Sequence, residues 1–179
     1  MAKITCKCMN LKNPSVFGSI NLGMTNVLRI GSKKATVITF LGEFLKAYSI
    51  TILSKFYLDY NNNQIIYVGL ALILGNIYPI ILRFKGGKGI CNFIGFLYAY
   101  ETKIGLIFIF LWLVIFFATS YSSLSSIITF TVTLLNIYLH NDILFIPLIA
   151  IFFLIIGKHL TNIKRMIRKK EETINLFRV

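Results

Sequence analysis

The chain has 179 residues, of which 56% are hydrophobic and 14% charged, and its mean hydropathy is +0.76. Because an average soluble domain carries about 25% charged residues, this composition excludes an ordinary soluble globule, and its apolar content excludes a disordered chain. The formal net charge is +13, and the charged residues lie between long apolar runs. This distribution excludes a soluble nucleic-acid-binding domain. The sequence therefore predicts an all-α fold, a polytopic bundle of transmembrane helices.

Six apolar segments divide the chain into three regions. Residues 1–34 contain no long apolar run and no secretory signal, so we expect an irregular cytoplasmic segment there. Residues 35–157 form the predicted membrane bundle, and residues 158–179 a basic cytoplasmic tail that contacts anionic headgroups. The third apolar segment covers only ~17 Å as a helix, so it is either a tilted span or a re-entrant helix. The six segments are 35–54, 64–82, 90–100, 104–119, 122–139 and 143–157.

The basic residues predict the orientation of this bundle. With six spans, sixteen of the 19 Lys and Arg residues face one side of the membrane. Only Lys55 and Lys103 face the other side, and Lys46 lies within a span. A five-span arrangement would place the basic tail outside, so the positive-inside rule predicts about six spans with both termini cytoplasmic.

The three cysteines carry little information about function. Cys6, Cys8 and Cys91 make an odd number and so form no closed set of disulfides. The spacing of Cys6 and Cys8 could suit a metal, but the only imidazole partners, His140 and His159, are far away in sequence. We interpret the cysteines as reduced thiols and predict neither a metal nor a cofactor.

The strongest local signal is the glycine-rich loop at residues 83–89, which reads Arg-Phe-Lys-Gly-Gly-Lys-Gly. Glycines permit positive φ and close backbone approach, and successive backbone N–H groups in such a turn can bind an anion. The next helix begins at once, so its N-terminal dipole points to the same place. The loop does not match a Walker A motif. It is either a phosphate site containing Lys85 and Lys88 or a flexible basic turn that only sets the membrane topology.

Two further segments on the same predicted side carry polar residues. Glu43 and Lys46 share one face of the first span, either as an ion pair that orients the helix or with Lys46 reaching an anionic substrate. The segment 18–29 is rich in small hydroxyl and amide residues and ends in Arg29. Taken alone, a capped surface turn explains this segment as well as a binding site does.

The last two candidate groups lie near the end of the fifth span and in the tail. His159 and Asn162 are three residues apart, so a helix places them on one face, where the histidine could move a proton or the helix could simply contact headgroups. Ser123 and Ser126 are either close-packing residues or ligands. Together these segments predict an anionic, phosphorylated substrate at the cytoplasmic surface.

At these residues the chain resembles the bacterial acyl-phosphate:glycerol-3-phosphate acyltransferases, the PlsY family. The family motifs occur in the right order from about residue 18 to 168. They are S-G-N-x-G-x-T-N-x-x-R at 19–29, D-x-x-K at 43–46, G-H-x-x-P at 75–79, F-K-G-G-K-G at 84–89, S-L-x-S at 123–126 and R-H-x-x-N-I-x-R at 158–165.

The chain departs from these motifs at several positions. Ile20 replaces a glycine, and a β-branched residue disfavours positive φ. Asn76 replaces a histidine, and Ser120 stands where many members have an arginine. The family also has a transmembrane helix before its first motif. In this chain, residues 2–4 correspond only to the cytoplasmic end of that helix. These departures leave open an inactive, truncated family remnant that binds lipid or a partner without catalysis.

The resemblance implies a multi-pass enzyme of the bacterial cytoplasmic membrane. It would transfer a fatty acyl group from acyl phosphate to glycerol 3-phosphate and form lysophosphatidic acid, the first step of phospholipid synthesis. The implied partners are membrane lipid and the soluble enzyme that produces acyl phosphate. The resemblance implies no nucleic-acid partner. The implied catalytic residues are Ser19, His159 and Asn162. The implied substrate-binding residues are Asn21, Asn26, Arg29, Lys46, Asn76, Lys85, Gly86, Gly87, Lys88, Gly89, Ser123 and Ser126.

Overall fold

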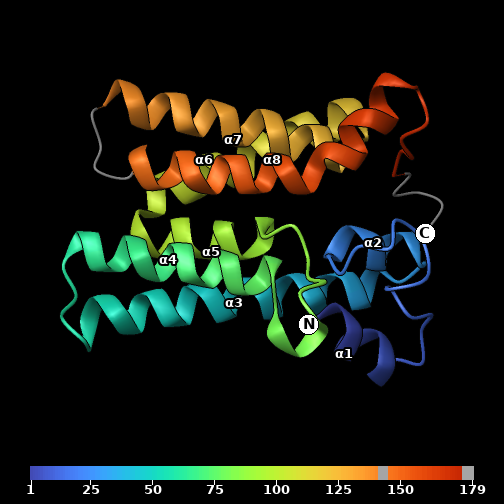
Figure 1. Ribbon diagram of the computed structural model, residues 1–179, viewed down its shortest axis with the longest axis horizontal. Helices are drawn as coiled ribbons and strands as arrows, with labels where there is room; N and C mark the ends of the chain where they lie inside the picture. Colours follow the sequence, from blue (N-terminus) through green and yellow to red (C-terminus); the bar gives the residue numbers. More distant parts are fainter. Residues whose placement is uncertain (141–144, 175–179) are drawn as a thin grey trace.

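The computed structural model describes residues 1–140 and 145–174, and this part of the chain contains helices and no strand (Figure 1). The predicted all-α bundle is therefore confirmed. The helices are α1 (Ala2–Cys8), α2 (Met24–Arg29), α3 (Lys33–Phe56), α4 (Asn62–Ile77), the 3-10 helix η1 (Ile80–Leu82), α5 (Ile90–Tyr100), α6 (Thr102–Thr119), α7 (Ser122–Leu139) and α8 (Phe145–Ile167).

Each predicted apolar segment contains a helix. Five are long and apolar enough to cross a membrane: α3, α4 with its continuation through η1, α6, α7 and α8. The short α5 occupies the third segment, and residues 143–144 of the sixth lie outside the described residues. The N-terminus, the segment 83–89 and the end of α8 lie toward one end of the bundle, as an even number of crossings requires (Figure 1). The membrane side that this end faces remains a prediction.

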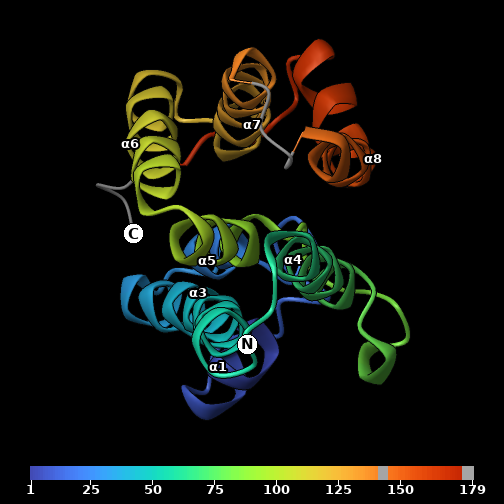
Figure 2. The same cartoon turned by 90° about the vertical axis from the view of Figure 1, so that its left-hand side faces the viewer.

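The short α5 is the central helix of the bundle. It lies beside α4, between a layer formed by α6, α7 and α8 and the helix α3 (Figure 2). The ring of Phe93 stacks on Phe130 of α7 with centroids 4.4 Å apart and meets Phe108 of α6 edge-on at 5.3 Å. On the opposite side, a Cβ at Gly95 would lie 2.4 Å from the carbonyl oxygen of Phe44 in α3, so glycine permits this close helix contact. Packing on both sides fixes where α5 begins.

The outer surface of the bundle is apolar. Large side chains on the long helices are exposed, among them Phe110 and Phe117 of α6. Polar side chains such as Ser123, Ser125 and Asn162 are buried instead, each with a hydrogen-bond partner. This arrangement suits a lipid environment, in which polar groups find partners inside the bundle.

The structure corrects the expectation for the N-terminal end of the bundle and adds detail at the C-terminal end. Residues 1–34 are not irregular throughout, because they contain α1 and α2. Ala2 and Cys6 of α1 are buried in a small cluster with Val27 and Ala35, which gives these short helices an apolar contact. At the other end, α8 continues to Ile167, so the first ten residues of the predicted tail belong to the last helix.

Candidate active site

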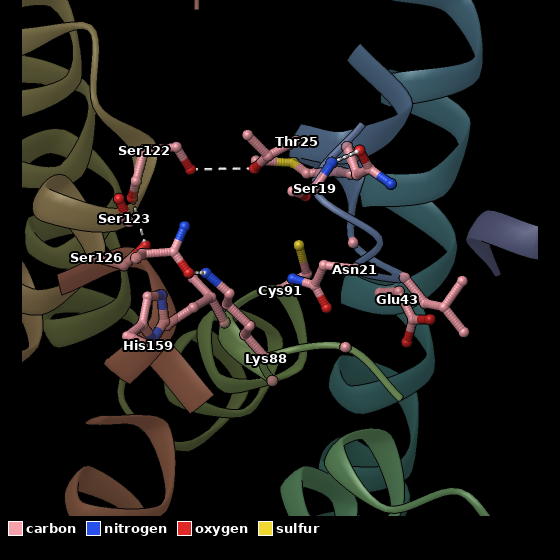
Figure 3. Close-up of a pocket in the computed structure, with 18 of the residues that line it drawn as sticks. Ser19, Asn21, Thr25, Glu43, Lys88, Cys91, Ser122, Ser123, Ser126 and His159 are labelled. Atoms are coloured by element: carbon pink, nitrogen blue, oxygen red, sulfur yellow. Dashed lines mark hydrogen bonds between the residues drawn. The ribbon is translucent and has the colours of Figure 1, made fainter. Parts of the chain in front are cut away.

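A polar pocket lies at the end of the bundle where α2, the start of α5 and the end of α8 meet (Figure 3). Twelve of the fifteen residues predicted for the site line it, and they come from five separate parts of the chain. They are Ser19, Asn21, Asn26, Arg29, Asn76, Gly87, Lys88, Gly89, Ser123, Ser126, His159 and Asn162. The remaining three, Lys46, Lys85 and Gly86, lie outside this pocket.

Asn26 builds the wall of the pocket formed by the first motif. Its buried side-chain amide donates to the carbonyl oxygens of Pro14 at 2.9 Å and Phe17 at 3.0 Å, and its oxygen accepts from the backbone N–H of Ser19 at 2.8 Å. Gly18 has a φ of +65°, and a Cβ there would lie 2.1 Å from the Asn26 amide oxygen. Asn26 therefore holds the loop in place, and its predicted role in binding substrate stays a prediction.

Ile20, at the position of the motif's glycine, adopts the left-handed conformation with a φ of +59°. Its side chain is 64% exposed, so no buried contact compensates for this conformation. A β-branched residue in this region costs about 1–2 kcal/mol relative to glycine. The loop therefore holds this backbone conformation at the expense of stability.

Lys88 is the cation of the glycine-rich loop that faces the pocket. Its ammonium group donates a hydrogen bond to the side-chain oxygen of Asn162 in α8 (Figure 3). Gly89 follows as the N-cap of α5 with a φ of +84°, so the α5 N-terminus lies beside the same space. Burial lowers the pKa of Lys88 to about 8; nearby Glu171 opposes this shift, and Arg29 and Arg165 add to it.

Lys85 and Gly86 belong to the same loop but not to the pocket. Lys85 is exposed on the outer side of the loop. Gly86 lies against α4, where a Cβ would be 2.1 Å from the carbonyl oxygen of Asn76. Residues Arg83 and Phe84 just before them both have positive φ, so the chain turns sharply here and only the later part of the loop reaches the pocket. Sequence spacing alone could not distinguish the two lysines.

His159 is buried on the inward face of α8, and the ring lies near Lys88 in Figure 3. Its Nδ1 lies 2.8 Å from the carbonyl oxygen of Ile155. Because a carbonyl oxygen only accepts, Nδ1 carries the proton, so in the neutral form of the ring Nε2 is the acceptor. The ring is thus oriented by its own helix and presents one basic nitrogen.

Glu171 is a pocket residue that the sequence analysis missed. The buried carboxylate accepts from the side-chain amide of Asn162 at 2.6 Å and from the hydroxyl of Ser123 at 3.2 Å, and it lies 3.7 Å from the guanidinium of Arg29. Downstream, the backbone N–H of Ile174 donates to the carbonyl oxygen of Ser120, so the end of the described chain crosses back over the bundle. The available signal was that only six acidic residues occur in the sequence, two of them adjacent within this basic tail.

A second missed residue, Trp112 of α6, lines the pocket beside the α7 serines. Its indole N–H donates to the hydroxyl of Ser126 at 3.0 Å, and that hydroxyl donates to the carbonyl oxygen of Ser122. The side chain of Ser122 in turn lies 3.0 Å from the hydroxyl of Thr25 in α2. These contacts fasten α2 and α6 to the start of α7, so the serines contribute to structure as well as to the pocket lining.

Lys46 is bound to Glu43 and lies outside the polar pocket, and its role in holding the substrate stays a prediction. Its ammonium group donates to the Glu43 carboxylate one helical turn away. Glu43 also accepts from the side-chain amide of Asn76 at 2.7 Å. A buried carboxylate requires a counter-charge, and Lys46 supplies it, so the ion-pair interpretation of these residues fits the structure.

Comparison with known proteins establishes the family. The family model for glycerol-3-phosphate acyltransferases matches residues 1–169. The chain belongs to this family. A glycerol-3-phosphate acyltransferase of Ruthia magnifica subsp. Calyptogena magnifica is 41% identical over 176 residues, which cover 97% of this chain and 89% of the relative. The acyltransferase of Francisella tularensis subsp. tularensis (strain FSC 198) is 38% identical over 176 residues, with 97% and 85% covered.

Solved structures of an acyltransferase of the same name extend the likeness to three dimensions. The crystal structure of PlsY, an integral membrane glycerol 3-phosphate acyltransferase, in its glycerol 3-phosphate form matches with a TM-score of 0.88 and 30% identity, covering 99% of this chain and 89% of that one. Its lysophosphatidic acid form matches with a TM-score of 0.85 over the same shares. Like PlsY, this acyltransferase family member is a multi-pass integral membrane protein.

Proposed function

We propose that this chain transfers a fatty acyl group from acyl phosphate to the primary hydroxyl of glycerol 3-phosphate, releasing lysophosphatidic acid and phosphate. Family membership supports the reaction class, and PlsY has been solved with glycerol 3-phosphate and with lysophosphatidic acid. The observation that carries the proposal is Lys88, a partly buried cation at the start of α5 that reaches Asn162 beside His159. Its location suits a phosphate at the border between polar pocket and lipid.

The two substrates each carry a phosphate, and the pocket offers two cations. Lys88, together with the α5 N-terminus that begins after Gly89, suits one phosphate. Arg29 lines the same pocket and is paired there with Glu171 at 3.7 Å and Glu172 at 3.4 Å, so it would bind the phosphate of the other substrate by exchanging these carboxylates for it. Ser19 is available to hydrogen-bond a reacting oxygen. The acyl chain would lie along the apolar outer surface, so the membrane itself solvates it.

The chemistry needs no protein nucleophile, because acyl phosphate is a mixed anhydride with a good leaving group. The glycerol 3-phosphate hydroxyl oxygen attacks the acyl carbon, the bond from that carbon to the phosphate oxygen breaks, and the electron pair leaves with phosphate. The hydroxyl proton passes to the departing phosphate, either directly or through Nε2 of His159. Positioning and stabilisation of the developing charge by Lys88 and Asn162 supply the rate.

The source of the acyl phosphate follows from its chemistry. A reactive anhydride with a long acyl chain must be made close to where it is used, and a soluble enzyme that produces it would deliver it to the pocket end of the bundle. We therefore include such an enzyme among the proposed partners and place the chain in the bacterial cytoplasmic membrane.

The two lysines of the glycine-rich loop provide a matched test. Lys88→Ala should lower acyl transfer in membranes by about 10- to 150-fold, because it removes a charge-assisted hydrogen bond. Lys85→Ala, in the same loop but outside the pocket, should stay within about twofold of the native rate. Native rates in Lys88→Ala would remove the loop from the site. A native chain without turnover would favour the inactive family remnant instead.

A further inference from the structure

Glu43 is a carboxylate buried in the membrane-spanning α3, and it lies between the polar pocket and a second cavity beside α1 and α4. It accepts hydrogen bonds from Lys46 of its own helix, from Asn76 of α4 at 2.7 Å and from the N-terminal ammonium group at 3.1 Å. An unpaired charge at this depth would be expensive. The bond to Asn76 joins two spans, so it has a role beyond neutralising the charge.

Asn76 is also the residue on which the glycine-rich loop rests. Its backbone carbonyl oxygen accepts from the N–H of Gly87 at 3.2 Å. A Cβ at Gly86 would approach that same oxygen to 2.1 Å, and one at Gly87 would lie 3.3 Å from the side-chain oxygen of Asn76. The loop is therefore pressed against both ends of this residue. Lys88, the residue after Gly87, lines the pocket. A shift of Asn76 would therefore move the loop and displace the lysine.

The Glu43–Asn76 hydrogen bond joins two side chains of fixed length from different helices, Glu43 of α3 and Asn76 of α4. Aspartate is shorter than glutamate by one methylene, and histidine reaches further than asparagine. Exchanging both residues would pair a shorter acid with a longer partner and nearly conserve the sum of the two side-chain lengths. The two exchanges should therefore compensate each other within one contact.

We propose that Glu43 and Asn76 form a length-matched pair that positions the Gly86–Gly87 turn, and that Glu43 is thereby a positioning residue for Lys88. The proposal rests on the proposed function in that the ligand of Lys88 is a phosphate. Glu43 does not bind this ligand itself, because a carboxylate repels a phosphate and Glu43 already has Lys46 as its counter-ion. It acts by holding Asn76, and Asn76 holds the loop.

A double-mutant cycle tests the pair in the full chain in detergent or membranes. Glu43→Asp leaves the acid about 1.5 Å too short, and Asn76→His places a longer ring against the native glutamate. Each single variant should lower kcat/KM by about 10- to 100-fold, because misplacement by about 1 Å has that effect on a reaction that depends on positioning. The double variant Glu43→Asp/Asn76→His should return to within about threefold of the native value.

Binding is measured in parallel, so that a failure of the proposed reaction can be told apart. Trp112 is the only tryptophan of the sequence and lines the pocket, so its fluorescence can follow glycerol 3-phosphate binding. If the native chain binds but does not turn over, the proposed function fails, while the pair is still supported by weaker binding in the single variants and recovery in the double. If the native chain neither binds nor turns over, both proposals are rejected.

Stability and a control on the same helix separate positioning from folding. Ser54→Ala removes a buried hydroxyl that donates to the carbonyl oxygen of Ile50 within α3, and it should leave kcat/KM per folded protein within about twofold. The Glu43 and Asn76 variants should still fold and lose activity per folded protein. Single variants with native kcat/KM and native binding would overturn the proposal. So would a double variant no better than the worse single, or single variants that lose activity only by failing to fold.

Discussion

Acyl transfer should fall as the pH rises through about 8, because Lys88 loses its proton there. Burial places the charged ammonium group at a disadvantage, which lowers its pKa from the ordinary 10.5. With a pKa of about 8, about 90% of the lysine is charged at pH 7 and about 10% at pH 9, so kcat/KM should fall about tenfold between these values. The folded state should also gain stability as the pH rises from about 8 toward 10.5, since the unfolded chain still binds this proton there.

The assay is the pH profile of kcat/KM in membranes, corrected at each pH for uncatalysed hydrolysis of acyl phosphate. In Lys88→Arg the cation keeps its charge at every pH tested, so whatever rate this variant retains should not fall between pH 7 and 9. Lys85→Arg is the matched control and should keep the native fall. A native profile that is flat to pH 10, or an identical fall in Lys88→Arg, would refute the assignment of this titration to Lys88.

Three further predictions concern the backbone and the topology. Ile20→Gly should relieve the positive φ of +59° and raise stability by about 1 kcal/mol, seen as a Tm increase of about 2–4 °C; an unchanged or lower Tm would contradict this. Gly86→Ala should abolish acyl transfer because its methyl group would lie 2.1 Å from the carbonyl oxygen of Asn76. The control Gly75→Ala in α4, where a methyl group would meet no atom within 4 Å, should keep the native rate. Equal rates of acyl transfer in the two variants would disprove the role of this contact. A cysteine introduced at Asn62 should react with an impermeant thiol reagent from outside the cell, and labelling only from the cytoplasm would reverse the predicted topology.

The sequence alone was sufficient for the features that depend on local pattern. Apolar runs located the helices because a membrane span must be apolar over most of its length. The three-residue spacing of His159 and Asn162 placed both on one helix face, and the structure finds both buried on that face. Residue type did not decide the backbone at Ile20, where a β-branched residue disfavours positive φ but the structure has a φ of +59°.

Only the tertiary structure decided which polar residues meet. Lys85 and Lys88 are equivalent in composition and spacing, but the sharp turn before the loop leaves one outside the pocket and brings the other to Asn162. Glu171 reaches the site because the chain after α8 crosses back over the bundle, a path that no local periodicity encodes. The pairing of Glu43 with Asn76 likewise depends on how α3 and α4 pack. Sequence patterns report the environment of a residue along its own helix, whereas a binding site depends on contacts between helices, which form only when the whole bundle packs.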